Sequence, residues 1–195
     1  MKFVLATHNP KKLKEMSEIL SSLGVEVVSP KELGIDLEVE ETGTTFGENA
    51  MLKAKAICEA ANLPAIADDS GLCVEALNGG PGVYSARYGG EGLDDKGRYQ
   101  LLLNSMRGQT TRAAYFASAI ACAFPNGDTI EAEGQVDGTI AFAPMGEGGF
   151  GYDPVFFYPP MKKTFGQMTA EEKHAISHRG KALEVFVEKL ATYLK

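Results

Sequence analysis

Residues 64–72 read Pro-Ala-Ile-Ala-Asp-Asp-Ser-Gly-Leu. The small apolar residues predict a buried strand, and Asp68-Asp69-Ser70-Gly71 predicts a sharp turn at its end. Carboxylate and hydroxyl oxygens held rigidly at a strand end can bind a hard cation such as Mg²⁺. The same residue types are also common in turns that bind nothing, because their side chains hydrogen-bond the local backbone. Taken alone, this stretch leaves both interpretations open.

The N-terminal residues predict a strand, a tight turn and a helix. Apolar residues 3–6 predict a strand, and leucines, isoleucine and methionine recur at helical spacing over 13–23. Between them lies Thr7-His8-Asn9-Pro10-Lys11-Lys12. Pro10 suits a first helical turn, Asn9 or Thr7 can cap it, and the backbone N–H groups with the two lysines can bind an anion. The alternative is that the lysines only solvate the helix surface.

An acidic segment, residues 36–43, precedes the next predicted helix. Thr45 and Glu48 have the spacing of a capping box, and small and apolar residues then form a narrow stripe. Asn49 and Lys53 lie one turn apart on a neighbouring face. One or two acids of the segment could share a metal with Asp69, or all could be soluble loop residues. The spacing does not choose between these.

The remaining pattern predicts an α/β protein with a mixed sheet. Residues 72–77 read as a strand and 94–106 as a helix. Residues 113–124 and 129–143 alternate around Pro125-Asn126-Gly127-Asp128, which is typical of a β-hairpin. The hairpin adds antiparallel strands to a sheet that begins with parallel ones.

Two further stretches combine polar groups with unusual backbone freedom. Residues 146–154 place glycines around Phe150 and Tyr152, so the backbone can approach a ligand and a ring can stack on a base, or the rings can be core residues of a hairpin. A second capping box opens a short helix that carries Lys173. His178 and Arg179 then begin the last helix, where the helix dipole disfavours cations, which hints at a ligand; a surface basic pair is the alternative.

Composition restricts the function. The 195 residues form one large domain or two lobes on one core, and the net charge of −7 disfavours nucleic acid as a partner. No apolar run predicts a membrane span or a signal peptide. The three cysteines are far apart and match no metal pattern, which favours core roles in a reducing, cytoplasmic setting.

Four separated motifs together resemble those of a known family. Thr7–Lys12, Ala67–Leu72, Phe150–Pro154 and Ser177–Arg179 stand in the order and spacing of the inosine/xanthosine triphosphate pyrophosphatases, which act on non-canonical purine nucleoside triphosphates. The likeness covers nearly the whole chain. One departure is His8, where many members have glycine. The resemblance implies a single α/β domain over 1–195, with a long mixed sheet flanked by helices, two lobes with a central cleft, and a homodimer.

The resemblance also implies an activity and a site. The expected reaction hydrolyses ITP, dITP and XTP to the monophosphate and pyrophosphate, with Mg²⁺ as cofactor and no nucleic-acid or membrane partner. Asp69 is implied as metal ligand and proton acceptor, with Glu40 as second ligand and Glu41 as its alternative. The implied substrate-binding residues are Thr7, His8, Asn9, Pro10, Lys11, Lys12, Lys53 and Ser70 on the phosphate side, and Phe150, Gly151, Tyr152, Asp153, Lys173, His178 and Arg179 on the nucleoside side.

Two other functions remain to be weighed against this enzyme. A regulator that binds a nucleotide would use the same residues but release no pyrophosphate. A pyrophosphatase for modified pyrimidine triphosphates would differ only in the substrates it accepts.

Overall fold

The structure is a computed structural model that describes residues 1–195. It is an α/β fold built on one open, seven-stranded mixed sheet with strand order β2-β1-β3-β4-β5-β6-β7. β1 is parallel to β2 and to β3, whereas β6 is antiparallel to both β5 and β7. The strands are β1 (Lys2–Leu5), β2 (Glu26–Val28), β3 (Ala65–Val74), β4 (Ala113–Ala123), β5 (Thr129–Ile140), β6 (Phe156–Tyr158) and β7 (Lys163–Thr164), and the α-helices are α1 (Pro10–Ser21), α2 (Phe46–Ala61), α3 (Asp95–Ser105), α4 (Ala170–Ile176) and α5 (His178–Tyr193).

The chain divides into two compact units. Unit 1 comprises Met1–Asp69, Ala119–Glu133 and Ala182–Lys195, and unit 2 comprises Ser70–Ser118 and Gly134–Lys181. The long strands β3, β4 and β5 each contribute residues to both units. The boundary on β3 falls between Asp69 and Ser70, within residues 64–72.

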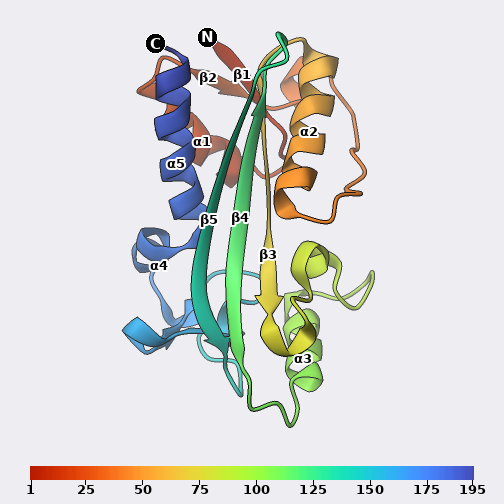
Figure 1. The fold of residues 1–195 in the computed structure, drawn as a ribbon. Helices are drawn as coiled ribbons and strands as arrows, with labels where there is room; N and C mark the ends of the chain where they lie inside the picture. Colours follow the sequence, from red (N-terminus) through yellow and green to blue (C-terminus); the bar gives the residue numbers. More distant parts are fainter. The chain divides into compact units, whose positions relative to one another are not determined.

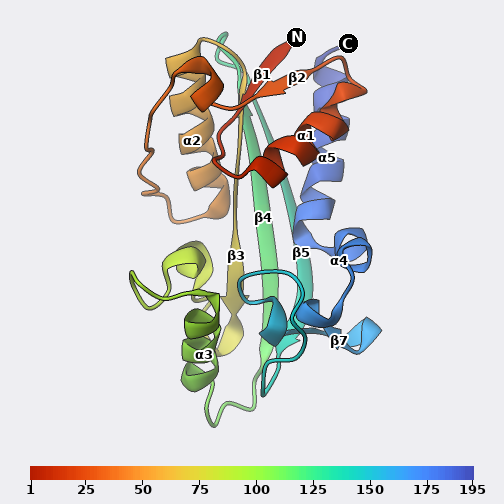
Figure 2. The same cartoon turned by 180° about the vertical axis from the view of Figure 1, so that it is seen from behind.

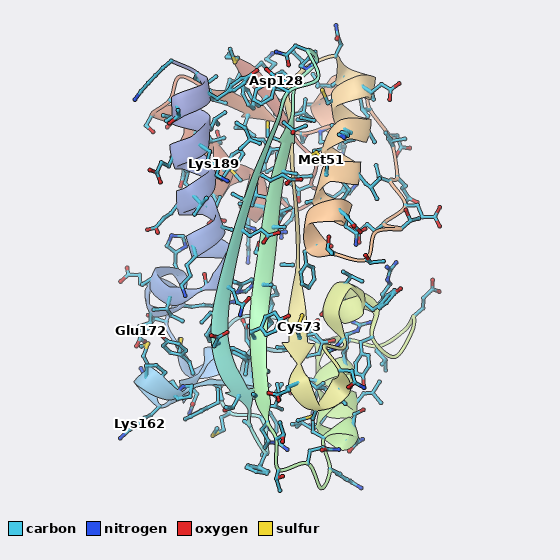
Figure 3. All side chains as sticks on the ribbon, viewed as in Figure 1. Met51, Cys73, Asp128, Lys162, Glu172 and Lys189 are labelled. Atoms are coloured by element: carbon cyan, nitrogen blue, oxygen red, sulfur yellow. The ribbon has the colours of Figure 1, made fainter.

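Unit 1 is layered, with helices on both faces of its part of the sheet. One core cluster joins α1 and α5 to strand residues such as Phe3 and Ile66, and another joins α2 to Val4 and to alanines of β3 and β4 (Figures 1 and 2). The alanines are 0–3% exposed, and their small side chains let the narrow stripe of α2 approach the sheet closely. Lys189, labelled in Figure 3, fastens α5 to β5 by donating to the Glu131 carbonyl at 2.7 Å.

Unit 2 has a core rich in aromatic rings. Phe116 of β4 packs against Phe156 at 4.5 Å and Phe165 at 5.6 Å between ring centroids, and Leu102 of α3 is fully buried in the same cluster. Glu172, labelled in Figure 3, closes the capping box at the start of α4.

The predicted hairpin is confirmed, because Phe124 and Asp128 close a tight turn between β4 and β5.

Two neighbouring sequence predictions are wrong. The separate strand predicted over 72–77 does not form, because residues 72–74 continue β3 and Glu75–Leu77 form a 3-10 helix. Asp68–Gly71 does not form a turn, because β3 continues from Ala65 to Val74 without interruption. Pairing within the sheet outweighs the local preference of Asp, Ser and Gly for turns. The two carboxylates therefore stand in the middle of a strand, where successive side chains alternate between the faces of the sheet. All three cysteines are buried, as predicted, and no helix has the length and apolar character that crossing a membrane requires.

Candidate functional site

Unit 1 carries a cluster of charged groups around the end of its part of β3. The Lys12 ammonium lies 2.7 Å from the Asp68 carboxylate. The Lys53 ammonium lies 2.9 Å from the Glu41 carboxylate and donates to the Asp68 carbonyl at 2.6 Å. These side chains are largely buried, with 14–32% of their surface exposed. We call Lys12, Glu41, Lys53 and Asp68 the carboxylate–lysine cluster.

The start of α1 brings Lys12 to this cluster. Asn9 is the N-cap, and its side chain accepts from the Lys11 N–H at 3.0 Å. Thr7 in turn accepts from the Asn9 N–H at 3.1 Å, and Pro10 opens the helix. The predicted cap is therefore confirmed. His8 and Lys11 are exposed. A helix N-terminus with adjacent lysines is suited to bind phosphate, because the dipole and the cations favour negative charge there.

Strand alternation places Asp68 and Asp69 on opposite faces of the sheet. Ile66 belongs to the core under α1 and α5, whereas Ala65 and Ala67 belong to the core under α2. Strand alternation therefore assigns Asp68 to the α1 face, where it pairs with Lys12, and Asp69 to the α2 face. α2 is also the helix that carries Lys53 and, through it, holds Glu41. The acidic segment and Asp69 thus belong to one side of unit 1.

The donors of unit 1 suit a magnesium ion in their chemistry. Carboxylate oxygens are hard ligands of the kind that Mg²⁺ prefers. No group of three or more acidic, histidine or cysteine side chains converges as a metal site in this structure. Mg²⁺ at nucleotide sites typically needs only one or two carboxylates, since substrate phosphates and water complete its shell. Glu40 is exposed while Glu41 pairs with Lys53, and the choice between them stays a prediction.

Unit 2 encloses a separate cavity of about 240 Å³. Its lining includes six of the seven predicted nucleoside-side residues, together with Ser70 of the phosphate side; the six are Phe150, Gly151, Tyr152, Asp153, Lys173 and His178. The His178 ring stacks on Phe116 with centroids 4.8 Å apart and planes within 15°. Arg179 follows His178 on α5 but does not line the cavity.

The loop Phe150–Asp153 is held in shape by its own side chains. The Asp153 carboxylate accepts from the Phe150 N–H at 3.0 Å and from the Lys173 ammonium at 2.5 Å. Burial raises the pKa of Asp153, and the Lys173 charge opposes that rise. Lys173 also lies 4.4 Å from the centre of the Phe150 ring, a cation–π contact. The ring itself is 72% exposed, so it is available to a ligand.

The two aromatics of this loop have different roles. Tyr152 is buried, as the alternative of core aromatics expected, and its hydroxyl donates to the Ser85 carbonyl at 2.6 Å. Burial raises the pKa of this hydroxyl, which therefore stays a donor at neutral pH. Ser85 is itself fixed, because its hydroxyl accepts from the Leu72 N–H at 2.9 Å and donates to the Gly82 carbonyl at 2.6 Å. The loop is thereby anchored to β3.

Sequence reasoning missed two polar residues of the cavity, Asp95 and Arg98 of α3. The Asp95 carboxylate accepts from the Gly151 N–H at 2.9 Å. Arg98 donates to the carbonyls of Tyr88 at 3.1 Å and Gly90 at 3.4 Å, next to the cavity. In the sequence, the only indication is the acidic pair Asp94-Asp95 at the start of the predicted helix. Such pairs are also common at ordinary helix N-termini, because the helix dipole favours negative charge there.

The fold and the two groups of residues define a class of protein. It is an α/β protein with an open mixed sheet, a carboxylate–lysine cluster in one unit and an aromatic, ion-paired cavity in the other. The chain belongs to the Ham1 family, whose model matches residues 3–189.

Full-length relatives support this assignment. The chain is 45% identical over 195 residues to the dITP/XTP pyrophosphatase of Exiguobacterium sp., with both chains fully covered. It is 48% identical over 183 residues to the dITP/XTP pyrophosphatase of Bacillus subtilis, covering 93% of this chain and 92% of the relative. The solved structure of the Staphylococcus aureus Ham1 protein matches with a TM-score of 0.95 and 42% identity, covering 99% of this chain and all of that one.

Proposed function

We propose that this protein hydrolyses ITP, dITP and XTP to the nucleoside monophosphate and pyrophosphate, and so removes deaminated purines from the nucleotide pool. The observation that supports this most is the pairing, in one chain, of a lysine-rich anion site with an exposed aromatic ring beside a buried ion pair. Family membership and the names of the full-length relatives point to the same substrates.

Unit 1 supplies the phosphate chemistry in this proposal. Lys12 and Lys53 neutralise the triphosphate, with Thr7 to Lys11 of unit 1 and Ser70, the first residue of unit 2, as further phosphate-side groups. Mg²⁺, when bound, would offset the charge that develops on the phosphates and lower the pKa of a coordinated water. Asp69, with Glu40 as the second acid, would hold the ion, and Asp69 would also accept the proton of the attacking water. Positioning and charge neutralisation are what phosphoryl chemistry chiefly requires, so no covalent nucleophile is needed.

Unit 2 supplies the recognition of the base. The exposed Phe150 ring can stack on a purine, and Lys173 and Asp153 hold that ring and its loop in place. Hypoxanthine and xanthine carry an oxygen at C6, whereas adenine carries an amino group. Donors such as Arg179 or a protonated His178 suit an oxygen, and an amino group would leave two donors facing each other. A site of this kind can reject the wrong analogue by about 10⁴-fold or more.

The decisive experiment measures pyrophosphate release across a panel of purine and pyrimidine triphosphates, with and without Mg²⁺. Rapid release from ITP and XTP, dependent on Mg²⁺, is the expected result. Binding of ITP without release would instead indicate a regulator, and release from modified pyrimidine triphosphates alone would indicate the other enzyme class.

Asp69→Asn tests the catalytic assignment. We expect this variant to lose turnover while it still binds a non-hydrolysable ITP analogue, because the amide cannot accept the proton of water but preserves the shape of the side chain. Near-normal pyrophosphate release by this variant would show that Asp69 does not have this role.

The proposal extends to assembly and location. A homodimer in the cytoplasm is the state we propose, and light scattering of the purified protein tests the first part. A mass equal to one chain of 20.9 kDa would contradict it.

A further inference from the structure

Asn49 of α2 is fully buried in unit 1, which is unusual for an amide side chain. Its Oδ1 atom accepts from the Gly43 N–H at 2.7 Å. Its Nδ2 atom is also buried and has no hydrogen-bond partner. The Gly43 N–H fixes which atom is oxygen, since a flipped amide would place two donors against each other. A buried donor without a partner destabilises a fold, so the Nδ2 group costs stability. The favourable contact of this side chain is the one that its Oδ1 atom makes with Gly43.

The hydrogen bond to Asn49 requires glycine at position 43. A Cβ atom at Gly43 would lie 2.7 Å from Asn49 Oδ1 and 2.7 Å from the Cβ of Glu48. Such distances are too short for any side chain, so only glycine lets the backbone come close enough to donate. The hydrogen bond therefore depends on both residues, and we call it the Asn49–Gly43 clamp.

The clamp lies at the end of the acidic segment, residues 36–43. Residues 35–43 have no helix or strand of their own. α2 holds the end of this segment by two side chains one turn apart: Asn49 binds Gly43, and Lys53 binds the Glu41 carboxylate at 2.9 Å. The pair Glu40-Glu41 is separated from Gly43 of the clamp by Thr42 alone, and the segment lies on the side of the sheet to which strand alternation assigns Asp69.

We propose that Asn49 is a positioning residue for Mg²⁺ binding. Through the clamp it fixes the acidic segment so that Glu40 or Glu41 reaches the ion together with Asp69, while Asn49 itself touches neither the ion nor the substrate. The inference rests on the proposed function, because that function gives the acidic segment its metal. Groups that orient metal ligands typically cost about 10- to 100-fold in metal affinity or activity when they are removed.

The test is a double-mutant cycle on metal affinity. Asn49→Ala removes the acceptor, Gly43→Ala forces the donor away, and the double variant does both. Calorimetry titrates Mg²⁺ into each protein, alone and saturated with an α,β-imido analogue of ITP. We expect each single variant to bind Mg²⁺ about 10- to 100-fold more weakly. The double variant should be no weaker than the weaker single one, because all three break the same contact.

A kinetic readout separates positioning from general damage. Because Asn49 does not touch the reacting atoms, kcat at saturating Mg²⁺ should stay near the wild-type value while the Mg²⁺ concentration for half-maximal rate rises. Ile57→Val is the matched control, since Ile57 is 3% exposed on the same helix and takes part in neither the Asn49–Gly43 hydrogen bond nor the Lys53–Glu41 ion pair. It lowers stability by a core effect alone and should leave Mg²⁺ affinity unchanged.

Each result of these measurements either supports or overturns the positioning role of Asn49. Wild-type Mg²⁺ affinity in Asn49→Ala, additive losses in the cycle, or an equal loss in Ile57→Val would overturn the role of Asn49. Should Asn49→Ala not fold, Gly43→Ala alone tests the clamp against Ile57→Val. Failure of the proposed function has a different signature, because wild-type protein would then release no pyrophosphate from ITP whatever the variants do.

Discussion

Phe150→Ala should weaken nucleotide binding with almost no effect on stability. The residue is 72% exposed, and the Lys173 ammonium lies 4.4 Å from the centre of its ring. Removing such a side chain changes the free energy of unfolding by about 0.5 kcal/mol or less. Stacking of one base on an aromatic ring contributes about 1–3 kcal/mol, which corresponds to a loss of about 5- to 160-fold in affinity.

The chain contains a matched control for this variant. Phe142 is 82% exposed, and the Arg112 guanidinium lies 4.1 Å from its ring centre, so it is also an exposed ring beside a cation in unit 2. It does not line the cavity. Phe142→Ala should therefore leave kcat/KM for ITP unchanged, whereas Phe150→Ala lowers it by about 5- to 160-fold, mainly through KM.

The assay is steady-state pyrophosphate release from ITP, accompanied by the melting temperature of each variant. Equal kcat/KM values for the two alanine variants would refute the stacking role of Phe150. A melting temperature of Phe150→Ala several degrees below that of Phe142→Ala would refute the premise that its ring is free for a ligand.

Three further predictions concern unit 2. Arg179→Ala should lower kcat/KM for ITP far more than for ATP; equal losses in a two-substrate comparison would show that Arg179 does not read the base. Asp95→Ala should raise KM for ITP by about fivefold, because the Gly151 N–H loses an acceptor worth about 1 kcal/mol. Asp95→Asn keeps an oxygen that can accept this hydrogen bond and should match wild type. Equal KM values for the two variants would contradict this prediction. Burial raises the folded pKa of Asp153 above its ordinary value of 3.8, so its contribution to stability is present below that value and is lost as pH rises through the folded pKa. In urea unfolding between about pH 4 and pH 7, wild type should therefore lose stability relative to Asp153→Asn as pH rises, and a difference that grows in the opposite direction would show the shift to be wrong.

Features set by neighbouring residues could be predicted from the sequence. The capping boxes at Thr45 and Thr169 and the Asn9 cap are confirmed, because each is completed within one turn of helix. The mixed sheet is confirmed for the same reason: the hairpin turn and the alternation around it are local signals.

Features set by tertiary placement could not be predicted. The turn at Asp68–Gly71 is wrong because pairing with neighbouring strands decides the backbone there. Asp95 reaches the cavity only because α3 packs beside the glycine-rich loop. Asn49 is completely buried where the Gly43 backbone approaches it closely. The helical spacing of apolar residues in the sequence gives no information about that approach. The roles of the site residues stay predictions until the variants are measured.

Under the proposed function, the carboxylate–lysine cluster is where this acidic chain would bind a polyanion. Each lysine of the cluster is paired with a carboxylate, Lys12 with Asp68 and Lys53 with Glu41, so no charge of the cluster is left unbalanced while it waits for a ligand. A triphosphate that draws these lysines to itself takes them from Asp68 and Glu41, and a divalent cation brought with it supplies positive charge in their place. A ligand that brings both charges can exchange both sets of partners together, with every group still compensated. Under the proposed function, the cluster is therefore matched to a metal–triphosphate complex rather than to either component, and we propose that the two bind as one.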